Sequence, residues 1–139
     1  MNNPSAPNSP SQADLIAAAL EARQRAHAPY SKFLVGAALE DEHGRIHTGC
    51  NIESASYGLT ICAERTALFK AISMGVRNFR RIAVAADSPQ LTPPCGACRQ
   101  VLRDHCRELE VILCNPRGES KVFQLSELFP YPFHDDFLA

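Results

Sequence analysis

The sequence has no tryptophan, 2 methionines and no long run of apolar residues. Because a helix needs about 20 consecutive apolar residues to cross a bilayer, we expect no membrane-spanning segment. An excess of one charge is also absent, since 14 Lys and Arg face 15 Asp and Glu. Proteins that bind nucleic acid or anionic membranes usually carry a basic surface, so we expect neither partner. The predicted partner is a small molecule that is close to neutral.

The start of the chain lacks the apolar core of a signal peptide. Residues 1–11 are rich in proline, serine and asparagine, which predicts a disordered N-terminal leader. With 45% hydrophobic residues in the whole chain, residues 12–139 are enough for one core and too few for two. Six cysteines without a secretory signal favour metal binding or free thiols over disulfides, and we expect a cytoplasmic protein.

Helical and extended patterns alternate along this domain. Apolar residues at helical spacing predict a helix that Ser11 and Asp14 open with a capping box and Pro29 closes. They also predict a second helix, capped by Thr60, with Gly75 after its end. A third helix is predicted over about 97–107, and a final helical turn is predicted to begin at Ser126. The order αββαβαββ predicts a three-layer α/β/α sandwich with a mixed five-stranded sheet, parallel at helical crossovers and antiparallel at two hairpins. The predicted strands are 33–40, 45–50, 81–87, 111–114 and a short segment around 122–123.

Two short cysteine clusters carry most of the chemical information. One is Cys62 with Glu64 and Arg65, and the other is the Cys-x-x-Cys pair formed by Cys95 and Cys98. The Cys-x-x-Cys spacing lets two thiolates converge on one ion from a helix start, and a third cysteine at another helix start can join them. Helix N-termini also stabilise thiolates. We therefore predict that the three cysteines bind zinc.

Two neighbours of Cys62 extend this interpretation. Three thiolates on a divalent cation leave a net charge of about −1, which Arg65 can offset from the same helix face. Glu64 can move protons beside the metal without being a ligand. The alternative for Arg65 is a solvated surface residue without a role at the metal. The alternative for Glu64 is an acid that only stabilises the first turn of a helix. The other cysteines and all five histidines lack a ligand spacing, which favours a catalytic site with an open position over a closed structural zinc module.

These motifs resemble those of the zinc-dependent cytidine deaminases, specifically the small homotetrameric nucleoside enzymes, in the variant with three cysteine ligands. The resemblance covers residues 15–133. It implies one zinc ion per subunit, catalytic proton transfer by Glu64, and hydrolytic deamination of cytidine and 2'-deoxycytidine to uridine and 2'-deoxyuridine. It further implies a role in pyrimidine salvage and a homotetrameric assembly.

Substrate contacts are implied by the same resemblance. The segment 30–37 is similar to the family's first-strand motif, in which Phe33 stacks on the pyrimidine ring. The segment 50–53 is similar to its ribose-binding segment, in which Asn51 and Glu53 bind the sugar hydroxyl. These two residues alternate along an extended stretch, so both can face one pocket.

Three further roles come only from the resemblance. It assigns a backbone contact with the base to Ala63 and completion of a neighbouring subunit's pocket to Tyr57 and Phe133, although 131–136 departs from the family pattern. A deaminase of another cytosine nucleoside, such as blasticidin S, shares the metal motifs and stays an alternative. The segment 50–53 suits an ordinary ribose, and the absence of a basic groove disfavours a polynucleotide substrate.

Overall fold

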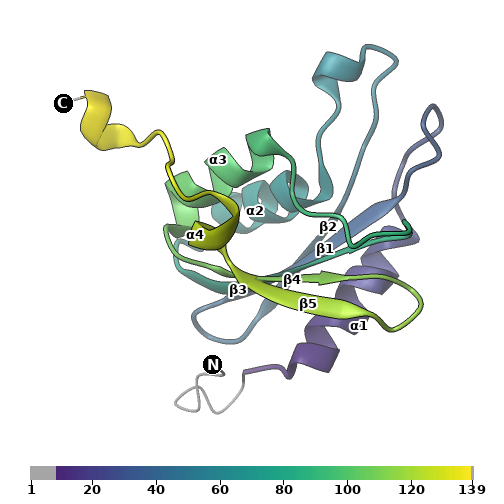
Figure 1. Cartoon of the computed structure of the whole chain (residues 1–139), viewed down its shortest axis with the longest axis horizontal. Helices are drawn as coiled ribbons and strands as arrows, with labels where there is room; N and C mark the ends of the chain where they lie inside the picture. Colours follow the sequence, from purple (N-terminus) through teal and green to yellow (C-terminus); the bar gives the residue numbers. More distant parts are fainter. Residues whose placement is uncertain (1–8, 139) are drawn as a thin grey trace.

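The computed structural model describes residues 9–138 and has the predicted α/β/α architecture (Figure 1). Of the predicted leader, residues 1–8 lie outside the described residues. No helix in the described part of the chain has the length and apolar character needed to cross a membrane. The helices are α1 (Gln12–Arg23), α2 (Ala63–Ser73), α3 (Gly96–Cys106) and α4 (Leu125–Leu128), with 3-10 turns η1 (Tyr57–Leu59) and η2 (Asp135–Leu138). The strands are β1 (Val35–Asp41), β2 (Ile46–Cys50), β3 (Phe79–Ala86), β4 (Glu110–Cys114) and β5 (Ser120–Gln124).

The sheet is mixed, with the strand order β2-β1-β3-β4-β5. Strand β1 is antiparallel to both β2 and β3, β3 is parallel to β4, and β4 is antiparallel to β5. Strands β2 and β3 therefore run in the same direction with β1 between them, and α2 forms the connection across β1. Helix α3 makes the crossover between the parallel neighbours β3 and β4. The predicted mixture of hairpins and helical crossovers is confirmed.

Helix α1 begins as the sequence predicts but ends earlier. The Ser11 hydroxyl accepts a hydrogen bond from the Asp14 N–H at 3.1 Å, and the Asp14 carboxylate accepts one from the Ser11 N–H at 3.1 Å. This capping box satisfies two backbone donors of the helix start. The helix ends at Arg23, well before Pro29, because His27 leaves it to form a β-bridge with Ile52.

The predicted cap of α2 is wrong by two residues. Cys62 occupies the N-cap position in an extended conformation, and the Thr60 hydroxyl instead accepts a hydrogen bond from the Ser54 N–H at 3.1 Å. Gly75 follows the helix with a φ of 93°, a conformation that favours glycine, so the predicted end is confirmed. The shift matters because it places a thiol, not a hydroxyl, beside the first free N–H groups of α2.

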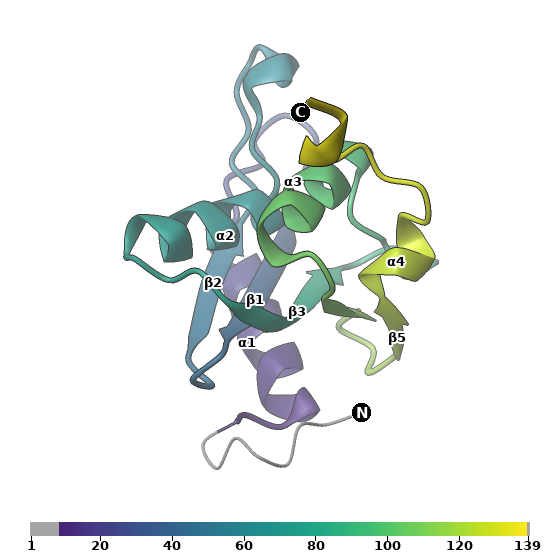
Figure 2. The same ribbon diagram turned by 90° about the vertical axis from the view of Figure 1, so that its left-hand side faces the viewer.

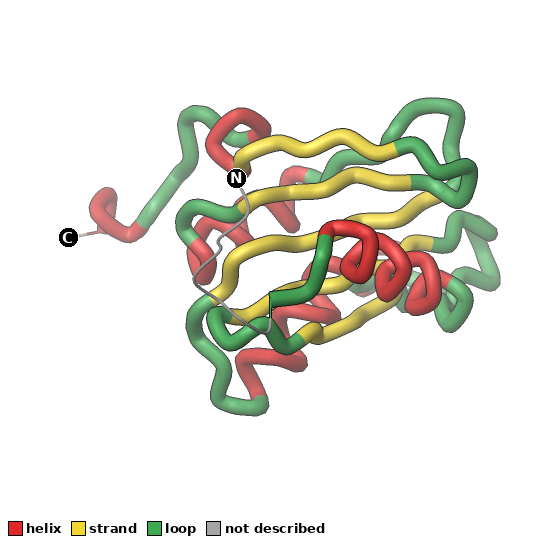
Figure 3. Tube along the Cα trace, turned by 90° about the horizontal axis from the view of Figure 1, so that it is seen from below, coloured by secondary structure: helices red, strands yellow, loops and turns green. Residues whose placement is uncertain are grey.

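Two hydrophobic clusters form the core on opposite faces of the sheet. Helix α1 packs on one face, while α2, α3 and α4 lie on the other (Figures 2 and 3). Two glycines permit close approach of the helices. A Cβ atom at Gly36 would lie 2.1 Å from the Ala19 carbonyl oxygen, and one at Gly49 would lie 2.4 Å from the Ala67 nitrogen. Gly49 thus fixes how closely α2, and with it Cys62, approaches β2.

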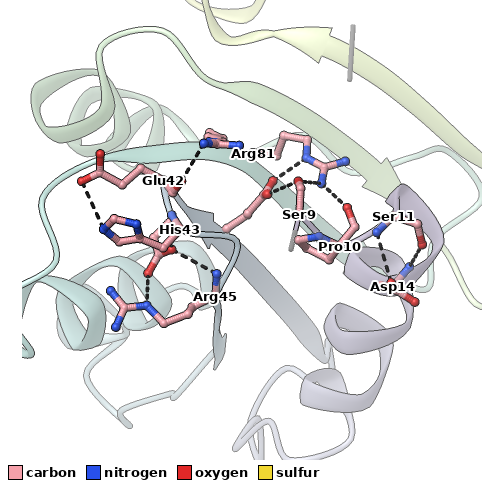
Figure 4. A network of polar contacts seen from close by, with 11 residues as sticks. Ser9, Pro10, Ser11, Asp14, Glu42, His43, Arg45 and Arg81 are labelled. Atoms are coloured by element: carbon pink, nitrogen blue, oxygen red, sulfur yellow. Dashed lines mark hydrogen bonds and ion pairs between the residues drawn. The ribbon is translucent and has the colours of Figure 1, made fainter. Parts of the chain in front are cut away.

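A buried polar network lies at the C-terminal end of β1 (Figure 4). The Arg81 guanidinium donates hydrogen bonds to the Glu40 carboxylate at 2.6 Å and to the Pro10 carbonyl at 2.5 Å. The Ser9 hydroxyl donates to the second Glu40 oxygen at 2.6 Å. Because Glu40 is fully buried, these partners are needed to keep its carboxylate solvated by the protein. The same contacts anchor the chain just before α1.

Candidate metal centre and active site

The three predicted zinc ligands lie at the starts of two neighbouring helices. Cys62 is the N-cap of α2, Cys95 is the N-cap of α3, and Cys98 is buried in the first turn of α3. The two helix starts lie side by side at the end of the molecule that carries the long loops (Figure 1). Both helices direct unpaired N–H groups and the positive end of their dipoles towards the sulfurs, which favours thiolates.

The spacing of the sulfur atoms fits zinc. All three Sγ atoms lie within 4.8 Å of one another, and those of Cys62 and Cys95 are 3.7 Å apart. Tetrahedral zinc with Zn–S bonds of about 2.3 Å requires sulfur atoms about 3.8 Å apart. Among residues 9–138, no histidine, aspartate, glutamate or further cysteine joins this cluster. The donor set is therefore three thiolates, which leaves one position of a tetrahedral ion to water or substrate.

Arg65 lies against the thiolate cluster, as its spacing from Cys62 predicts. Its Nη2 atom donates a hydrogen bond to the Cys62 Sγ at 3.5 Å. Hydrogen bonds from Cys98 and from Arg65 lower the pKa of Cys62 to about 5, although partial burial opposes this. The same Cys62–Cys98 contact, together with burial, raises the pKa of Cys98. Arg65 thus lies where its positive charge stabilises a thiolate at Cys62.

Glu64 is the buried acid of the site. It lies in the first turn of α2 with a relative exposure of 4%. Burial raises its pKa to about 7, and the negative charge of Cys62 adds to the effect. A carboxyl group with a pKa near neutral can both accept and donate a proton at physiological pH, which is what general acid–base catalysis requires.

Phe33 and Asn51 are joined at the start of β1. The Asn51 amide nitrogen donates to the Phe33 carbonyl at 2.8 Å, and its amide oxygen accepts from the Val35 N–H at 2.9 Å. Asn51 is buried, while the Phe33 ring is 39% exposed. The Asn51 side chain therefore fixes the backbone on both sides of an accessible ring. The sequence did not reveal this positioning role, and the predicted contacts of both residues with substrate stay predictions.

Glu53 holds the loop before Phe33. Its carboxylate accepts hydrogen bonds from the Tyr30 N–H at 3.0 Å, the Ser31 N–H at 3.1 Å and the Ser31 hydroxyl. The Ser31 hydroxyl contributes most to the lowered pKa of this carboxyl group. Sequence reasoning missed Ser31 as a partner of Glu53, although the Tyr30-Ser31 pair is part of the motif that identified Phe33. The predicted ribose contact of Glu53 stays a prediction.

A backbone bridge brings the substrate segment to the metal cluster. Ile52, between Asn51 and Glu53, exchanges hydrogen bonds with Ile61 at 2.9 and 3.0 Å. Ile61 directly precedes Cys62, so the 50–53 segment lies alongside the chain that enters α2. The structure thus brings together two motifs that are separated in the sequence.

Comparison with known proteins decides the family. Residues 9–114 match the family model described as the cytidine and deoxycytidylate deaminase zinc-binding region. The chain belongs to this family. Zinc is accordingly the metal of the site, and Cys62, Cys95 and Cys98 are positioned to bind it.

Individual relatives agree with this assignment to the cytidine deaminases. The cytidine deaminase of Sporosarcina psychrophila is 48% identical over 126 residues, covering 90% of this chain and 93% of that protein. The probable cytidine deaminase of Dictyostelium discoideum is 56% identical over 126 residues, covering 89% and 85%. The crystal structure of cytidine deaminase from Burkholderia pseudomallei superposes with a TM-score of 0.87 at 47% identity, covering 89% of this chain and all of that one.

Three other residues named from the cytidine deaminase motifs occupy different environments. The Ala63 side chain is fully buried in the core, and its backbone opens α2. The Tyr57 ring is 61% exposed and meets Tyr30 edge-to-face, with centroids 6.2 Å apart. The Phe133 ring, on the segment after α4, is 54% exposed and stacks on Phe137 at 5.6 Å. Their predicted substrate roles stay predictions.

Proposed function

We propose that the protein catalyses the hydrolytic deamination of cytidine and 2'-deoxycytidine, giving uridine or 2'-deoxyuridine and ammonia. The observation that carries this function is the buried Glu64, with a pKa of about 7, beside three thiols spaced for zinc. Zinc held by Cys62, Cys95 and Cys98 supplies the Lewis acidity that makes water a nucleophile near neutral pH.

Glu64 carries the protons of this reaction. It takes a proton from the attacking water and delivers it to N3 of the cytosine ring, which makes C4 more electrophilic. The water oxygen forms a bond to C4, and Glu64 then takes the remaining proton of this hydroxyl group and passes it to the exocyclic amine. The C4–N bond breaks as the C4 carbonyl forms, which releases ammonia. Burial supports this cycle because it keeps the neutral and ionised forms of Glu64 close in free energy.

Arg65 adjusts the charge of the metal centre. Three thiolates on zinc give a net charge of about −1, which weakens its pull on a bound ligand. The Arg65 guanidinium, 3.5 Å from the Cys62 sulfur, withdraws part of that negative charge. Its Nε atom is buried and has no hydrogen-bond partner among the described residues.

The nucleoside is proposed to lie between the metal and the start of β1. Phe33 stacks on the pyrimidine ring, the backbone of Ala63 contacts the base, and Asn51 and Glu53 face the ribose. Support comes from the exposed Phe33 ring and from the Ile52–Ile61 bridge, which places the 50–53 segment beside Cys62. No observation favours blasticidin S or a closed structural zinc site over this assignment.

Assembly and cellular role complete the proposal. We infer a homotetramer with one zinc ion per subunit, in which Tyr57 and Phe133 complete the pocket of a neighbouring subunit. The exposed rings of both residues support this arrangement, because exposed aromatic groups favour burial at interfaces. We place the enzyme in the cytoplasm, in pyrimidine salvage.

A substrate panel tests the proposed function. Zinc-loaded protein is incubated separately with cytidine, 2'-deoxycytidine, cytosine and blasticidin S, and ammonia release is followed. We expect release from the two nucleosides and little from free cytosine, which lacks the ribose that Asn51 and Glu53 are proposed to bind. Ammonia release from blasticidin S alone would identify the other deaminase, and release from none of the four would contradict catalysis.

A further inference from the structure

The residues that follow Cys98 in its motif have no role in the chemistry above, yet both are hydrogen-bonded to distant backbone. Arg99 donates from Nε to the Pro94 carbonyl at 2.7 Å and from Nη1 to the Leu128 carbonyl at 2.6 Å. One guanidinium thus joins the loop just before Cys95 to the last residue of α4. Both bonds are short, partly buried and formed by a charged donor, which strengthens them.

The two residues just before Cys95 have no backbone donors. Pro93 and Pro94 directly precede the cysteine and lack the N–H groups that could bond to neighbouring backbone. The carbonyl of Pro94 is therefore the polar group closest to Cys95 on that side, and Arg99 binds it. Further back, Arg117 binds Asp87 and the Ser88 carbonyl, and the Ser88 hydroxyl forms hydrogen bonds with Gln90 and Thr92. Arg99 is therefore the side chain that anchors the last residue before Cys95.

Gln100 makes a parallel connection further along the chain. Its amide nitrogen donates to the Phe133 carbonyl and to the Asp104 carboxylate, each at 2.9 Å. Helix α3 therefore binds the C-terminal segment at two points, Leu128 and Phe133, through consecutive side chains. In Figure 2 the C-terminal segment runs from α4 back over the end of α3.

We propose that Arg99 is a positioning residue for the metal site: it clamps Pro94 to Leu128 and thereby holds the Cys95 sulfur at zinc-binding distance from Cys62 and Cys98. Helix α4 is then part of the scaffold of the metal site, although it contributes no ligand. Arginine suits this task because its donors lie in a rigid planar fork, whereas a lysine ammonium is a single point that cannot span two separate carbonyls. The inference rests on the proposed zinc enzyme, but its consequence is a property of metal binding.

Helix α3 supplies two matched controls. Arg103 lies one turn beyond Arg99, is likewise partly exposed, and makes no hydrogen bond or ion pair with its side chain within the described chain. Replacing Arg103 with alanine therefore removes the same group from the same helix without touching the clamp. Gln100→Ala removes the hydrogen bond to the Phe133 carbonyl but leaves the contact between Arg99 and Pro94. It therefore distinguishes the effect of loosening the C-terminal segment from the effect of loosening the loop before Cys95.

The test measures zinc release from each folded holoprotein to an excess of chromogenic chelator. We expect Arg99→Ala to release zinc about tenfold faster, as for other residues that orient metal ligands, and Arg99→Lys to be intermediate. Arg103→Ala and Gln100→Ala should release zinc at the parent rate. In the cobalt-substituted proteins, the ligand-field and thiolate charge-transfer bands should change in the Arg99 variants only.

The outcomes are distinct. Parent rates and unchanged cobalt spectra in both Arg99 variants would overturn the proposal, as would equal acceleration in Arg103→Ala. If Arg99→Ala does not fold, Arg99→Lys, which retains charge and length, decides by the same criteria. Because metal release is read without substrate, faster release in a protein that deaminates no nucleoside would uphold this inference while the proposed function failed.

Discussion

The Glu64 carboxyl group and the Cys62 thiol lie two residues apart at the start of α2, and their environments shift their pKa values in opposite directions. Burial raises the pKa of Glu64 to about 7, while hydrogen bonds from Cys98 and Arg65 lower the pKa of Cys62 to about 5. One group is thus suited to exchange protons and the other to bind metal as a thiolate. This division of roles depends on the burial of Glu64 and on the contacts of Cys62 with Arg65 and with Cys98 of α3.

The ligand assignment is tested at the same scale by replacing Cys95 with serine. A serine hydroxyl is a much weaker zinc ligand than a thiolate, so we expect the purified variant to lose most of its zinc. Metal content is measured by atomic emission on protein dialysed against dilute chelator. Cys106→Ala is the control, because Cys106 is a half-buried thiol whose pKa is raised by burial to about 12 and which lies outside the cluster. Full zinc occupancy in Cys95→Ser would contradict the assignment.

The sequence predicted the ligand residues better than the substrate residues. Cys95 and Cys98 were predictable from their spacing, because a helix start fixes where a thiol three residues on must lie. Cys62 was predictable from its place at the start of another expected helix. The hydrogen bonds of Asn51 with Phe33 and Val35 were not predictable, since they depend on two strands meeting at one end. A polar residue in an extended segment can face either substrate or backbone, and the sequence does not distinguish the two.

At the scale of elements, the end of β1 contains a buried carboxylate that makes stability depend on pH. Burial opposes ionisation of Asp41, but hydrogen bonds from His47, from Arg45 and from the N–H of His43 outweigh it and lower the pKa to about 2, from an ordinary 3.8. A group with a lowered folded pKa stabilises the fold above its unfolded pKa, and this stabilisation is lost as the pH falls through the folded value.

We therefore expect Asp41 to contribute about 2 kcal/mol to the free energy of unfolding at neutral pH, and this contribution to disappear between pH 4 and pH 2. Urea unfolding of the parent and of Asp41→Asn across this range measures the difference. The two curves should converge at low pH. Asp135→Asn, which alters an exposed carboxyl group, is the control, and a constant gap between parent and Asp41→Asn would contradict the linkage.

The contact between α2 and β2 is tested by Gly49→Ala. The added Cβ would lie 2.4 Å from the Ala67 nitrogen and 2.7 Å from the Ala63 carbonyl oxygen, so α2 must move away from the sheet. Overpacking of this kind costs about 1–3 kcal/mol and should lower the thermal unfolding temperature. Gly58→Ala, where nothing lies within 4 Å of the new Cβ, should leave it unchanged. Equal unfolding temperatures for Gly49→Ala and the parent would show that the close packing is not needed.

The boundaries of elements were predictable where local chemistry decides them. The Ser11 capping box and the glycine after α2 were read correctly, because caps act within one turn of the chain. The start of α2 was misread because Thr60 is a good cap by residue type, whereas its hydroxyl is engaged by Ser54 across a loop. Tertiary contacts also end α1 early, through the bridge between His27 and Ile52.

At the scale of the whole molecule, the sequence predicted three layers but not the order of the strands. Strand β1 lies between β2 and β3 because it forms hydrogen bonds with a neighbouring strand along each of its two edges. The local sequence pattern of a strand does not reveal which strands will be its neighbours. Helix α1 approaches the sheet closely at Gly36, and α2 approaches it closely at Gly49. The packing role of these glycines was not predictable, because their partners on α1 and α2 lie far away in the sequence.

The proposed assembly is a prediction at this scale. Tyr57 and Phe133 expose most of their rings in the single chain, and we expect these rings to be buried between subunits. Light scattering of the purified protein should give the mass of four chains. Tyr57→Ala should weaken this assembly or raise the KM for cytidine, since the ring is proposed to serve a neighbour's pocket. A stable monomer with full activity would contradict the shared pocket.

The central claim is that the buried Glu64 transfers protons beside three zinc-binding thiolates, and Glu64→Gln tests it most directly. Glutamine keeps the size of the side chain but cannot exchange protons, so the variant should fold and retain zinc while kcat for cytidine falls by a factor of about 100 or more. Glu21→Gln, on the exposed side of α1, is the control and should retain parent activity. Parent-like ammonia release by zinc-loaded Glu64→Gln would contradict the account.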